Sequence, residues 1–278
     1  MKDVEVLNSQ RLGTRELRPL SLHKVFPLIN PERMAILTDG DGTLFDSKPT
    51  NVRGFLAAVD RFYLDRAPAD VVERAKIHIV DCHRLGQYAW FRRDLWAILR
   101  PYSSGLFGDE VEMDEALSAV RNQYVLDAVG RGEIVLFRQV LLFFQELASV
   151  GRPAALYSAN GKALMEKMLT MMLGGEEEMN RLLPVRHYGR SLPGDLRSKP
   201  YPDGYELAAK DLRRKPEECV ILEDEVEPIV HAVTAGFGGA VHFEVAQHDR
   251  LVRRELRERL NGLRCRVHVA HRFRQLHL

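Results

Sequence analysis

The sequence predicts an α/β protein: a doubly wound parallel sheet into which an all-helical segment is inserted. Short apolar runs alternate with helical patterns over the second half of the chain, and such alternation implies right-handed crossovers between parallel strands. Residues 48–133, in contrast, show helical periodicity and no strand-like alternation. Two of the apolar runs end in paired acidic residues, which is where an open α/β sheet binds its ligands.

The composition restricts the possible partners and compartment. The chain has 278 residues, of which 45% are hydrophobic and 28% charged, and its net charge is +1. Such a balance argues against a nucleic acid or a membrane surface as partner. The three cysteines form no Cys-x-x-Cys pair, so we expect neither disulfides nor zinc, and a cytoplasmic location. We expect no secretory signal and no membrane span, and the sequence carries no sign of an oligomeric state.

The first apolar run, residues 34–37, is predicted to be a buried strand that delivers Asp39 and Asp41 at its carboxyl end. Gly40 and Gly42 alternate with these acids and allow a tight turn close to a ligand. One carboxylate could then bind a cation or attack an electrophile while the other handles protons. The alternative is an Asp-Gly-Asp-Gly hairpin turn, a common local structure.

The segment 48–133 is predicted to be helical throughout. The expected helices run from Val52 to Tyr63, from about Ala69, from about Arg84 through Trp96, and from about Asp114 to Val129. The third contains Arg92 and Arg93 directly after two aromatic residues. Guanidinium groups bind anions well, so these arginines are candidates to recognise a substrate. The alternative is that the aromatic residues pack a helical core and the arginines face solvent.

After residue 133 the pattern becomes an alternation of helices and strands. The expected strands are residues 154–157, 185–188, 219–222 and 239–243. The expected helices are residues 137–150, 161–173, 203–212 and 226–236. Asn160 is expected to cap the second of these helices, and Asp203 and Glu206 are expected to form a capping box at the third.

Three further stretches are candidates for chemistry. Ser158 follows a predicted strand, where its hydroxyl could hold a phosphoryl oxygen; the alternative is an ordinary turn. Lys199 lies beside prolines in an extended segment that could fix its reach; the alternative is an exposed loop lysine. Glu223 and Asp224 follow another predicted strand, although acids there also suit the N-terminus of the next helix.

These stretches together resemble the four ordered motifs of the haloacid dehalogenase superfamily, whose members transfer phosphoryl groups through an aspartate nucleophile. The first motif matches Asp39-x-Asp41-x-Thr43, and Ser158, the Lys199-Pro-x-Pro-Asp stretch and the Glu223-Asp224 pair match the other three. The similarity extends over about residues 34–245 and is greatest to the branch of β-phosphoglucomutase and phosphoglycolate phosphatase. It implies a Rossmann-like core with an inserted helical cap that closes over the active site.

The resemblance also implies roles for the residues of the core. Asp39 would attack phosphorus and form an aspartyl-phosphate, and Asp41 would act as acid and base. Lys199 would neutralise the phosphoryl group, which Ser158 would also contact. Thr43 and Asn160 are assigned to substrate binding, together with the two arginines of the helical segment.

A magnesium ion is the expected cofactor, because Mg²⁺ prefers carboxylate and water oxygens. In the resembling family its ligands correspond to the Asp39 carboxylate, the backbone carbonyl of Asp41 and Asp224, with Glu223 as a second or an outer-shell ligand. The sequence departs from the family at Glu225, where serine is usual, and three residues further on at a proline, where glycine is usual.

The expected function is that of an Mg²⁺-dependent phosphatase acting on a small phosphorylated metabolite. The acid at Asp41 disfavours dehalogenase and phosphonate-cleaving activities, which lack it in the resembling family. Two alternatives remain: a phosphomutase of the same superfamily, and a non-catalytic binding or regulatory protein on the same fold.

The expected domains are an N-terminal extension (residues 1–33), a catalytic core (34–47 and 134–278) and a helical cap (48–133). The tail from His248 contains nine arginines and three acidic residues. We expect it to form a solvated helix and a last edge strand at residues 265–269. Nucleic-acid contact is the alternative, and the absence of interleaved aromatic residues argues against it.

Overall fold

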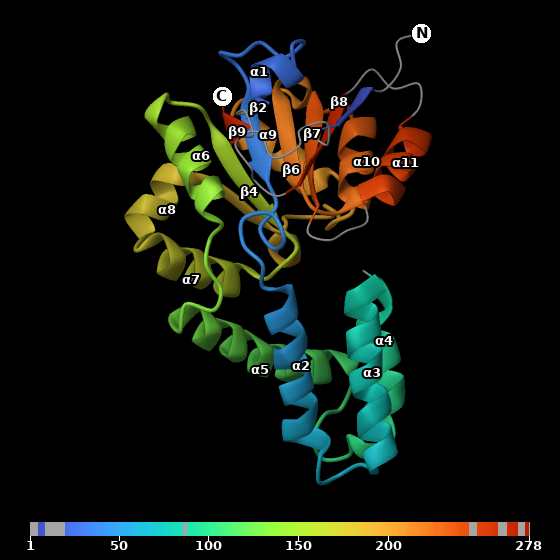
Figure 1. The fold of residues 1–278 in the computed structure, drawn as a ribbon. Helices are drawn as coiled ribbons and strands as arrows, with labels where there is room; N and C mark the ends of the chain where they lie inside the picture. The colour runs from blue at the N-terminus through green and yellow to red at the C-terminus, as the bar shows by residue number, and fades with distance from the viewer. Residues whose placement is uncertain are drawn as a thin grey trace, which may run out of the picture. The chain divides into compact units, whose positions relative to one another are not determined.

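The larger part of the chain is built on parallel strands. The computed structural model describes residues 5–8, 20–85, 88–244, 249–260, 266–271 and 276–277. The strands are β1 (Glu5–Asn8), β2 (Leu20–Ser21), β3 (Ala35–Thr38), β4 (Ala154–Ser158), β5 (Val185–Tyr188), β6 (Cys219–Glu223), β7 (Gly239–Glu244), β8 (Arg266–His271) and β9 (Leu276–His277). Seven of them form one sheet in the order β1-β8-β7-β6-β3-β4-β5, and β2 pairs with β9 (Figure 1).

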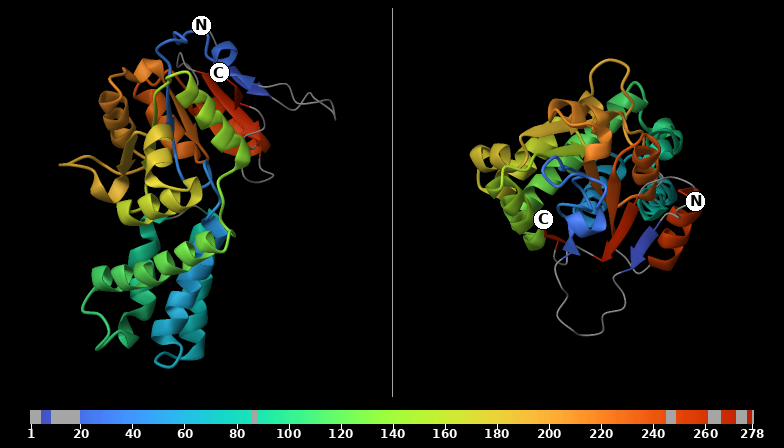
Figure 2. Two further views of the ribbon diagram at one scale, coloured as in Figure 1. Left: turned by 90° about the vertical axis from the view of Figure 1, so that its left-hand side faces the viewer. Right: turned by 90° about the horizontal axis from the view of Figure 1, so that it is seen from above.

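Helices cover both faces of this sheet (Figures 1 and 2). They are α1 (Leu22–Val25), α6 (Arg138–Ser149), α7 (Lys162–Leu173), α8 (Glu176–Leu182), α9 (Asp203–Asp211), α10 (Val226–Thr234) and α11 (Asp249–Arg259). Ala35 and Leu37 of β3 face a hydrophobic core shared with α9, α10 and α11. All four residues of β3 are buried, as expected of a central strand covered on both sides. The predicted doubly wound α/β fold is confirmed.

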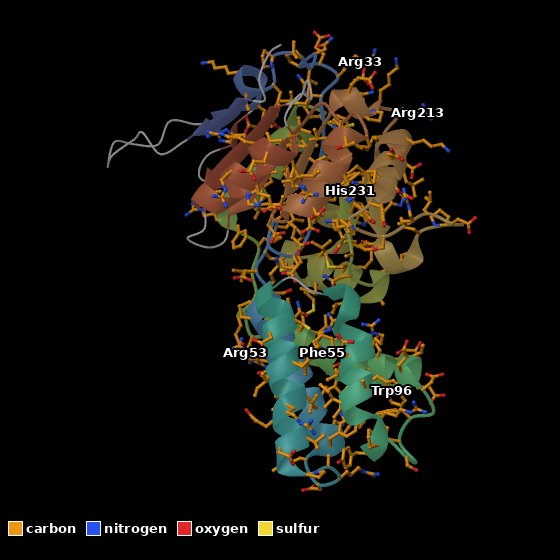
Figure 3. The ribbon with its side chains drawn as sticks, turned by 90° about the vertical axis from the view of Figure 1, so that its right-hand side faces the viewer. Arg33, Arg53, Phe55, Trp96, Arg213 and His231 are labelled. Atoms are coloured by element: carbon orange, nitrogen blue, oxygen red, sulfur yellow. The ribbon has the colours of Figure 1, made fainter. Side chains whose placement is uncertain are left out.

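Residues 47–134 form a second compact unit. Its helices are α2 (Lys48–Tyr63), α3 (Ala69–Leu85), α4 (Tyr88–Leu99) and α5 (Glu110–Gly130), with a short 3₁₀ turn at Arg100–Tyr102. The described residues of this unit include no strand. Phe55 of α2 and Trp96 of α4 contribute to its own hydrophobic core (Figure 3). Arg121 is buried beside this core, where it donates a hydrogen bond to the Asn51 side chain at 3.1 Å.

The prediction of a last edge strand at residues 265–269 is wrong. The strand β8 lies between β7 and β1, and β1 occupies that side of the sheet. Residues Glu5–Asn8 pair in parallel with Arg266–Val269, so the N-terminal extension contributes a strand to the core. Because a four-residue strand has too little length to show alternation, this pairing left no pattern in the sequence.

Two helix starts also differ from the prediction. Helix α7 begins after Gly161, with no side-chain cap, and Asn160 instead donates its backbone N–H to the Ser158 hydroxyl at 3.2 Å. Helix α9 has Pro202 at its N-cap position and no side-chain cap. The Asp203 carboxylate accepts hydrogen bonds from the backbone N–H and the guanidinium of Arg197 instead. The carboxylate therefore closes the preceding loop and does not form a capping box.

Helix α9 and strand β4 approach each other closely at one glycine. A Cβ atom on Gly204 would collide with the ring of Tyr157, which is fully buried. The glycine therefore leaves the space that the Tyr157 ring fills. The ring in turn makes an edge-to-face contact with Tyr205, with centroids 4.9 Å apart.

We predict that Gly204→Ala destabilises the protein by roughly 1–3 kcal/mol, because the added methyl group overpacks a closed site. Alanine is otherwise the better helix former by about 1 kcal/mol, so the Tyr157 contact decides the sign. Gly161→Ala is the matched control, since a Cβ there meets no atom within 4 Å and φ is −71°. Urea unfolding of both variants measures the difference, and an unchanged or raised stability of Gly204→Ala would contradict the prediction.

Candidate active site

The carboxyl ends of three adjacent strands bring the predicted residues together. Asp39 follows β3 directly, and its backbone N–H donates to the Leu222 carbonyl of β6 at 2.8 Å. Glu223 is the last residue of β6, and Ser158 is the last residue of β4. Because β3 lies between β4 and β6, all three ends open onto the same crevice.

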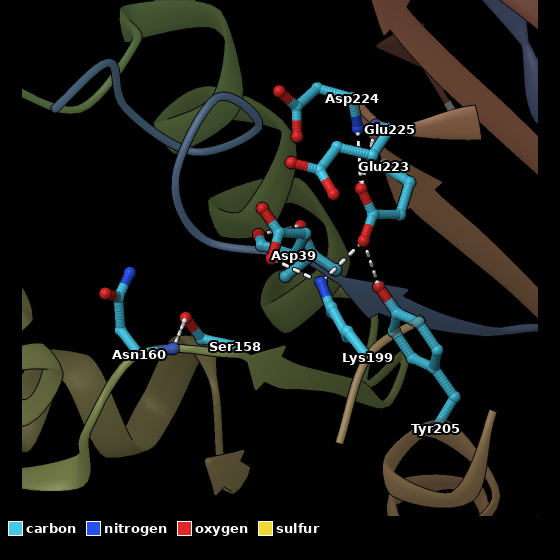
Figure 4. A network of polar contacts seen from close by, with 9 residues as sticks. Asp39, Ser158, Asn160, Lys199, Tyr205, Glu223, Asp224 and Glu225 are labelled. Carbon is cyan, nitrogen blue, oxygen red and sulfur yellow. Dashed lines mark hydrogen bonds and ion pairs between the residues drawn. The ribbon is translucent and has the colours of Figure 1, made fainter. Parts of the chain in front are cut away.

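Lys199 reaches this crevice from the loop before α9 (Figure 4). Its Nζ donates to Asp39 Oδ1 and, at 2.5 Å, to Glu223 Oε1. Its side chain is only 8% exposed, so the ammonium group is a buried charge shared by two buried carboxylates. The rings of Tyr157 and Tyr205 lie beside it, with centroids 5.3 and 5.2 Å from Nζ. Aromatic faces attract a cation, so the rings favour the charged form of the lysine.

Glu223 is the most completely bonded acid of the site. Its Oε1 accepts from Lys199 and, at 3.1 Å, from the Tyr205 hydroxyl. Its Oε2 accepts from the backbone N–H groups of Asp224 at 2.9 Å and Glu225 at 3.0 Å. A carboxylate offers about four lone-pair positions, and four donors occupy them here. The geometry therefore makes Glu223 primarily the fixed counter-ion of Lys199.

The two carboxyl groups beside Lys199 differ in their pKa values. Burial raises the pKa of Asp39 from 3.8 to about 7; the Lys199 charge opposes this and the Glu223 charge adds to it. Burial acts on Glu223 in the same direction, but Lys199 and the hydrogen bonds from its other donors hold the pKa of Glu223 below its ordinary value. The same carboxylates hold the pKa of Lys199 well above its ordinary value despite burial. The single ammonium neutralises the Glu223 carboxylate, so ionisation of the second buried carboxyl group, Asp39, is unfavourable.

The acids of the site suit a hard divalent cation. Among the described residues, Asp39, Glu223 and Asp224 place carboxylate oxygens within 4.8 Å of one another. A Cβ on Gly42 would collide with the Asp224 carboxylate, and Gly42 has φ of +91°, which glycine adopts readily. The turn after Asp41 therefore leaves room for that carboxylate. Three clustered carboxylates against one ammonium form an oxygen-rich, net negative set of the kind that Mg²⁺ prefers.

The three residues predicted to contact the phosphoryl group or the substrate, Ser158, Asn160 and Thr43, differ in burial and in their hydrogen bonds. Ser158 is buried, and its Oγ lies 3.5 Å from the position of a Cβ built on Gly40. Asn160 is half-buried two residues later. Thr43 is fully buried, and its hydroxyl has no hydrogen-bond partner within the described part of the chain. Substrate contacts by these residues stay predictions.

Three other described residues singled out by the sequence lie outside the cluster of acids. Asp41 is half-buried on the loop after β3, outside the trio of clustered acids. Glu225 is exposed, and its backbone N–H serves Glu223. Arg93 is exposed on α4 and pairs with Asp94 at 3.1 Å. The side chain of Arg92 lies outside the described residues. The assignment of the two arginines to substrate binding stays a prediction.

Sequence reasoning missed Tyr205 and Tyr157. Both occupy buried positions, on α9 and β4, where any large apolar side chain would fit the pattern. The available signal was chemical: a buried tyrosine hydroxyl usually finds a hydrogen-bond partner. Tyr205 lies six residues after Lys199, at the start of the helix that follows the lysine loop, so that partner was to be sought among the site acids.

The comparisons with known proteins decide the family. A family model described as haloacid dehalogenase-like hydrolase matches residues 34–235. The chain belongs to this family. No curated protein matches it. The family resemblance and the hydrolase class inferred from the motifs are thereby confirmed.

Several solved structures share the fold of this chain. A family IA, variant 3 hydrolase from Entamoeba histolytica has a TM-score of 0.59 at 17% identity, covering 88% of this chain and 96% of its own. CbbY from Rhodobacter sphaeroides in complex with phosphate has a TM-score of 0.54 at 18% identity, and the match covers 86% of this chain and 94% of CbbY. A family hydrolase from Deinococcus radiodurans with bound phosphate and sodium has a TM-score of 0.54 at 19% identity, covering 85% and 91%. Among the described residues of this hydrolase, none of the helices has the length and hydropathy needed to cross a membrane.

We predict that, with metal chelated, Asp39 makes folding stability fall as pH rises from about 4 to about 7. Its folded pKa of about 7 lies above its ordinary value, so the folded state holds the proton more tightly, and the resulting stability is lost as pH rises through that range. Asp39→Asn lacks this titration. The stability of wild type relative to Asp39→Asn, from urea unfolding at pH 4.5, 6 and 7.5, should therefore decrease with pH. A constant or increasing difference would contradict the raised pKa.

Proposed function

We propose that this hydrolase is a Mg²⁺-dependent phosphatase that cleaves a small phosphorylated metabolite through an aspartyl-phosphate on Asp39. One observation carries the proposal: the Lys199 ammonium bonds the carboxylate that would attack, at the carboxyl edge of a parallel sheet. Phosphoryl transfer depends mainly on positioning and on charge neutralisation, and this arrangement supplies both around one carboxylate. The family to which the chain belongs supports the same chemistry.

The proposed reaction uses the chain's own groups in two steps. In the first, an oxygen of Asp39 forms a bond to phosphorus while the bond to the ester oxygen breaks, and Asp41 gives that oxygen a proton. In the second, Asp41 takes a proton from water, the water oxygen attacks phosphorus, and the Asp39 carboxylate leaves with its electron pair. The products are the alcohol and inorganic phosphate.

In both steps the other polar groups of the site would stabilise the negative charge on the phosphoryl oxygens. Lys199 lies beside Asp39 and offsets negative charge on the phosphoryl oxygens, and the Ser158 hydroxyl is available to donate to one of them. Asp39, Asp224 and the backbone carbonyl of Asp41 would hold Mg²⁺, with Glu223 in the outer shell because its oxygens are already bonded. Bound there, the cation would supply further neutralisation of the phosphoryl oxygens.

The proposed substrate class, small phosphorylated metabolites, is supported by the ligands of solved structures with the same fold. Phosphate and, in a variant of CbbY, xylulose-1,5-bisphosphate are bound in structures that share this fold. We assign the helical segment, residues 48–133, the role of a cap that selects the substrate, with Arg92 and Arg93 as candidates to contact its non-reacting groups. Thr43 and Asn160 are the candidates within the core.

Substitution of Asp39 and substitution of Asp41 should have different effects on catalysis. Asp39→Asn lacks the attacking oxygen and should abolish turnover of every phosphate ester. Asp41→Asn keeps the nucleophile, so its first step should survive in part with p-nitrophenyl phosphate, whose leaving group needs little protonation. Its second step should slow by about 10²–10⁴-fold, because water must still be activated. Rapid mixing, an acid quench and peptide mass measurement should show a phosphoryl group on the peptide that carries Asp39.

Three outcomes would point away from this proposal. Phosphorylation of Asp41 or Ser158 in the wild-type enzyme would overturn the assignment of the nucleophile. Transfer of the phosphoryl group back to a sugar phosphate, with a bisphosphate activator and without release of inorganic phosphate, would identify a phosphomutase. Binding of inorganic phosphate without turnover of any ester in a phosphometabolite screen would identify a non-catalytic protein.

Removal of metal should abolish activity reversibly. The buried acids of the site exceed the lysine in charge, so a cation is needed to bring an anionic substrate beside them. We expect no measurable hydrolysis after exhaustive chelation, full recovery with Mg²⁺ and poor recovery with Ca²⁺, whose larger and looser shell misplaces the nucleophile. Asp224→Asn should raise the Mg²⁺ concentration required for half-maximal activity, whereas exposed Glu225→Gln is the control with little effect. Full activity in chelator would refute the metal requirement.

A further inference from the structure

We propose that Tyr205 is a positioning residue for the reaction: its hydroxyl fixes the Glu223 oxygen against which the Lys199 ammonium is set. This inference rests on the proposed phosphatase function and adds a residue that lies outside the four family motifs. Tyr205 bonds Glu223 and reaches the reacting atoms only through it and the lysine (Figure 4).

Lys199 and Tyr205 share one oxygen of the Glu223 carboxylate. Glu223 Oε1 accepts from Lys199 Nζ at 2.5 Å and from the Tyr205 hydroxyl at 3.1 Å. The other oxygen, Oε2, is held by two backbone N–H groups that directly follow β6. The hydroxyl is therefore the one donor to Glu223 from the helix α9, among the described residues, and it prevents Oε1 from following the lysine when the lysine moves.

The hydrophobic core, not the site, sets the position of the Tyr205 hydroxyl. Tyr205 is fully buried, and its ring makes edge-to-face contacts with Tyr157 at 4.9 Å and with Phe237 at 6.3 Å between centroids. A ring held on two sides has little freedom, so its Oη is a rigid point of attachment. The tyrosine thus transmits the rigidity of the core to a carboxylate in the site.

In the proposed reaction Lys199 must bond the phosphoryl group as well as the two acids. Its ammonium group has three donor positions, and Asp39 and Glu223 each take one in this structure. A phosphoryl oxygen needs the third. If Glu223 were free to turn away, the ammonium would lose its second partner, and Asp39 alone, to which it already donates, would set its position. By fixing Glu223, Tyr205 keeps the lysine shared between two acids and available to substrate.

The test is Tyr205→Phe, which removes the hydroxyl and keeps the ring. Tyr63→Phe is a matched control, because Tyr63 is also fully buried and its hydroxyl hydrogen-bonds Ser103 at 2.8 Å in the helical unit. With p-nitrophenyl phosphate and Mg²⁺, Tyr205→Phe should lower kcat about tenfold, as expected for the loss of a hydrogen bond to a charged group, and change KM less than about twofold. The control should change both constants less than about twofold, with a comparable loss of thermal stability.

A double-mutant comparison shows whether the hydroxyl acts through the carboxylate. In a Glu223→Gln background, removal of the Tyr205 hydroxyl should lower kcat by no more than about twofold, because the charge that it fixes is gone. An equal tenfold loss in both backgrounds would overturn the inference, and so would a Tyr205→Phe enzyme with the kcat of wild type.

These outcomes are separate from failure of the proposed function. If the wild-type protein hydrolyses no phosphate ester, the phosphatase proposal fails, and crystal structures of wild type and Tyr205→Phe then test the positioning directly. The inference requires Glu223 Oε1 and Lys199 Nζ to shift or to become disordered in the variant. Unchanged, well-ordered positions of both atoms would overturn it.

Discussion

The site depends on a buried ammonium group that must have partners. Lys199 comes from a loop, Asp39 from the end of β3 and Glu223 from the end of β6. Pairing of Thr38 with Leu222 in the parallel register brings the two acids to the same level, and the backbone bond from Asp39 to Leu222 extends it by one residue. Loss of one partner from a buried ion pair costs about 3–5 kcal/mol. A change of register between β3 and β6 would separate one carboxylate from Lys199, so the charge pairing of the site stabilises the register of the sheet. The ion pairs that stabilise the crevice are thus made by the same side chains that the proposed reaction uses.

The same cluster is electrostatically incomplete on its own. Three clustered acids face one lysine, and burial already raises the pKa of Asp39 to about 7. A protonated Asp39 would not attack phosphorus. A bound cation would favour the ionised carboxylate, so in the proposed mechanism it would also prepare Asp39 as the nucleophile.

The sequence was sufficient for the parts of the molecule governed by short-range patterns. Apolar runs located the central strands, and the rule that ligands bind at their carboxyl ends placed Asp39, Glu223 and Asp224 together. The sequence was insufficient where a residue far away along the chain, or outside the local pattern, determines the structure. Strand β1 pairs with a strand some 260 residues away, and Asp203 binds Arg197 although the local pattern offered it a helix N-terminus. Tyr205 was missed because burial on α9 accounts for its ring and conceals its hydroxyl.

The two tyrosines show why core and site are hard to separate in this hydrolase. Tyr157 and Tyr205 belong to the hydrophobic core beneath the sheet and also form the wall beside Lys199. Gly204 gives Tyr157 its space, and Tyr157 packs against Tyr205, whose hydroxyl holds Glu223. Each of these contacts is an ordinary packing contact or hydrogen bond, but together they connect Gly204 to the Lys199 ammonium group. Because close-packed interiors transmit small displacements, we expect a methyl group added at residue 204 to displace the Tyr157 ring and, through Tyr205, to disturb the groups that hold Lys199 as well as the fold. The position of Lys199 is therefore a property of the core as much as of the loop that carries it.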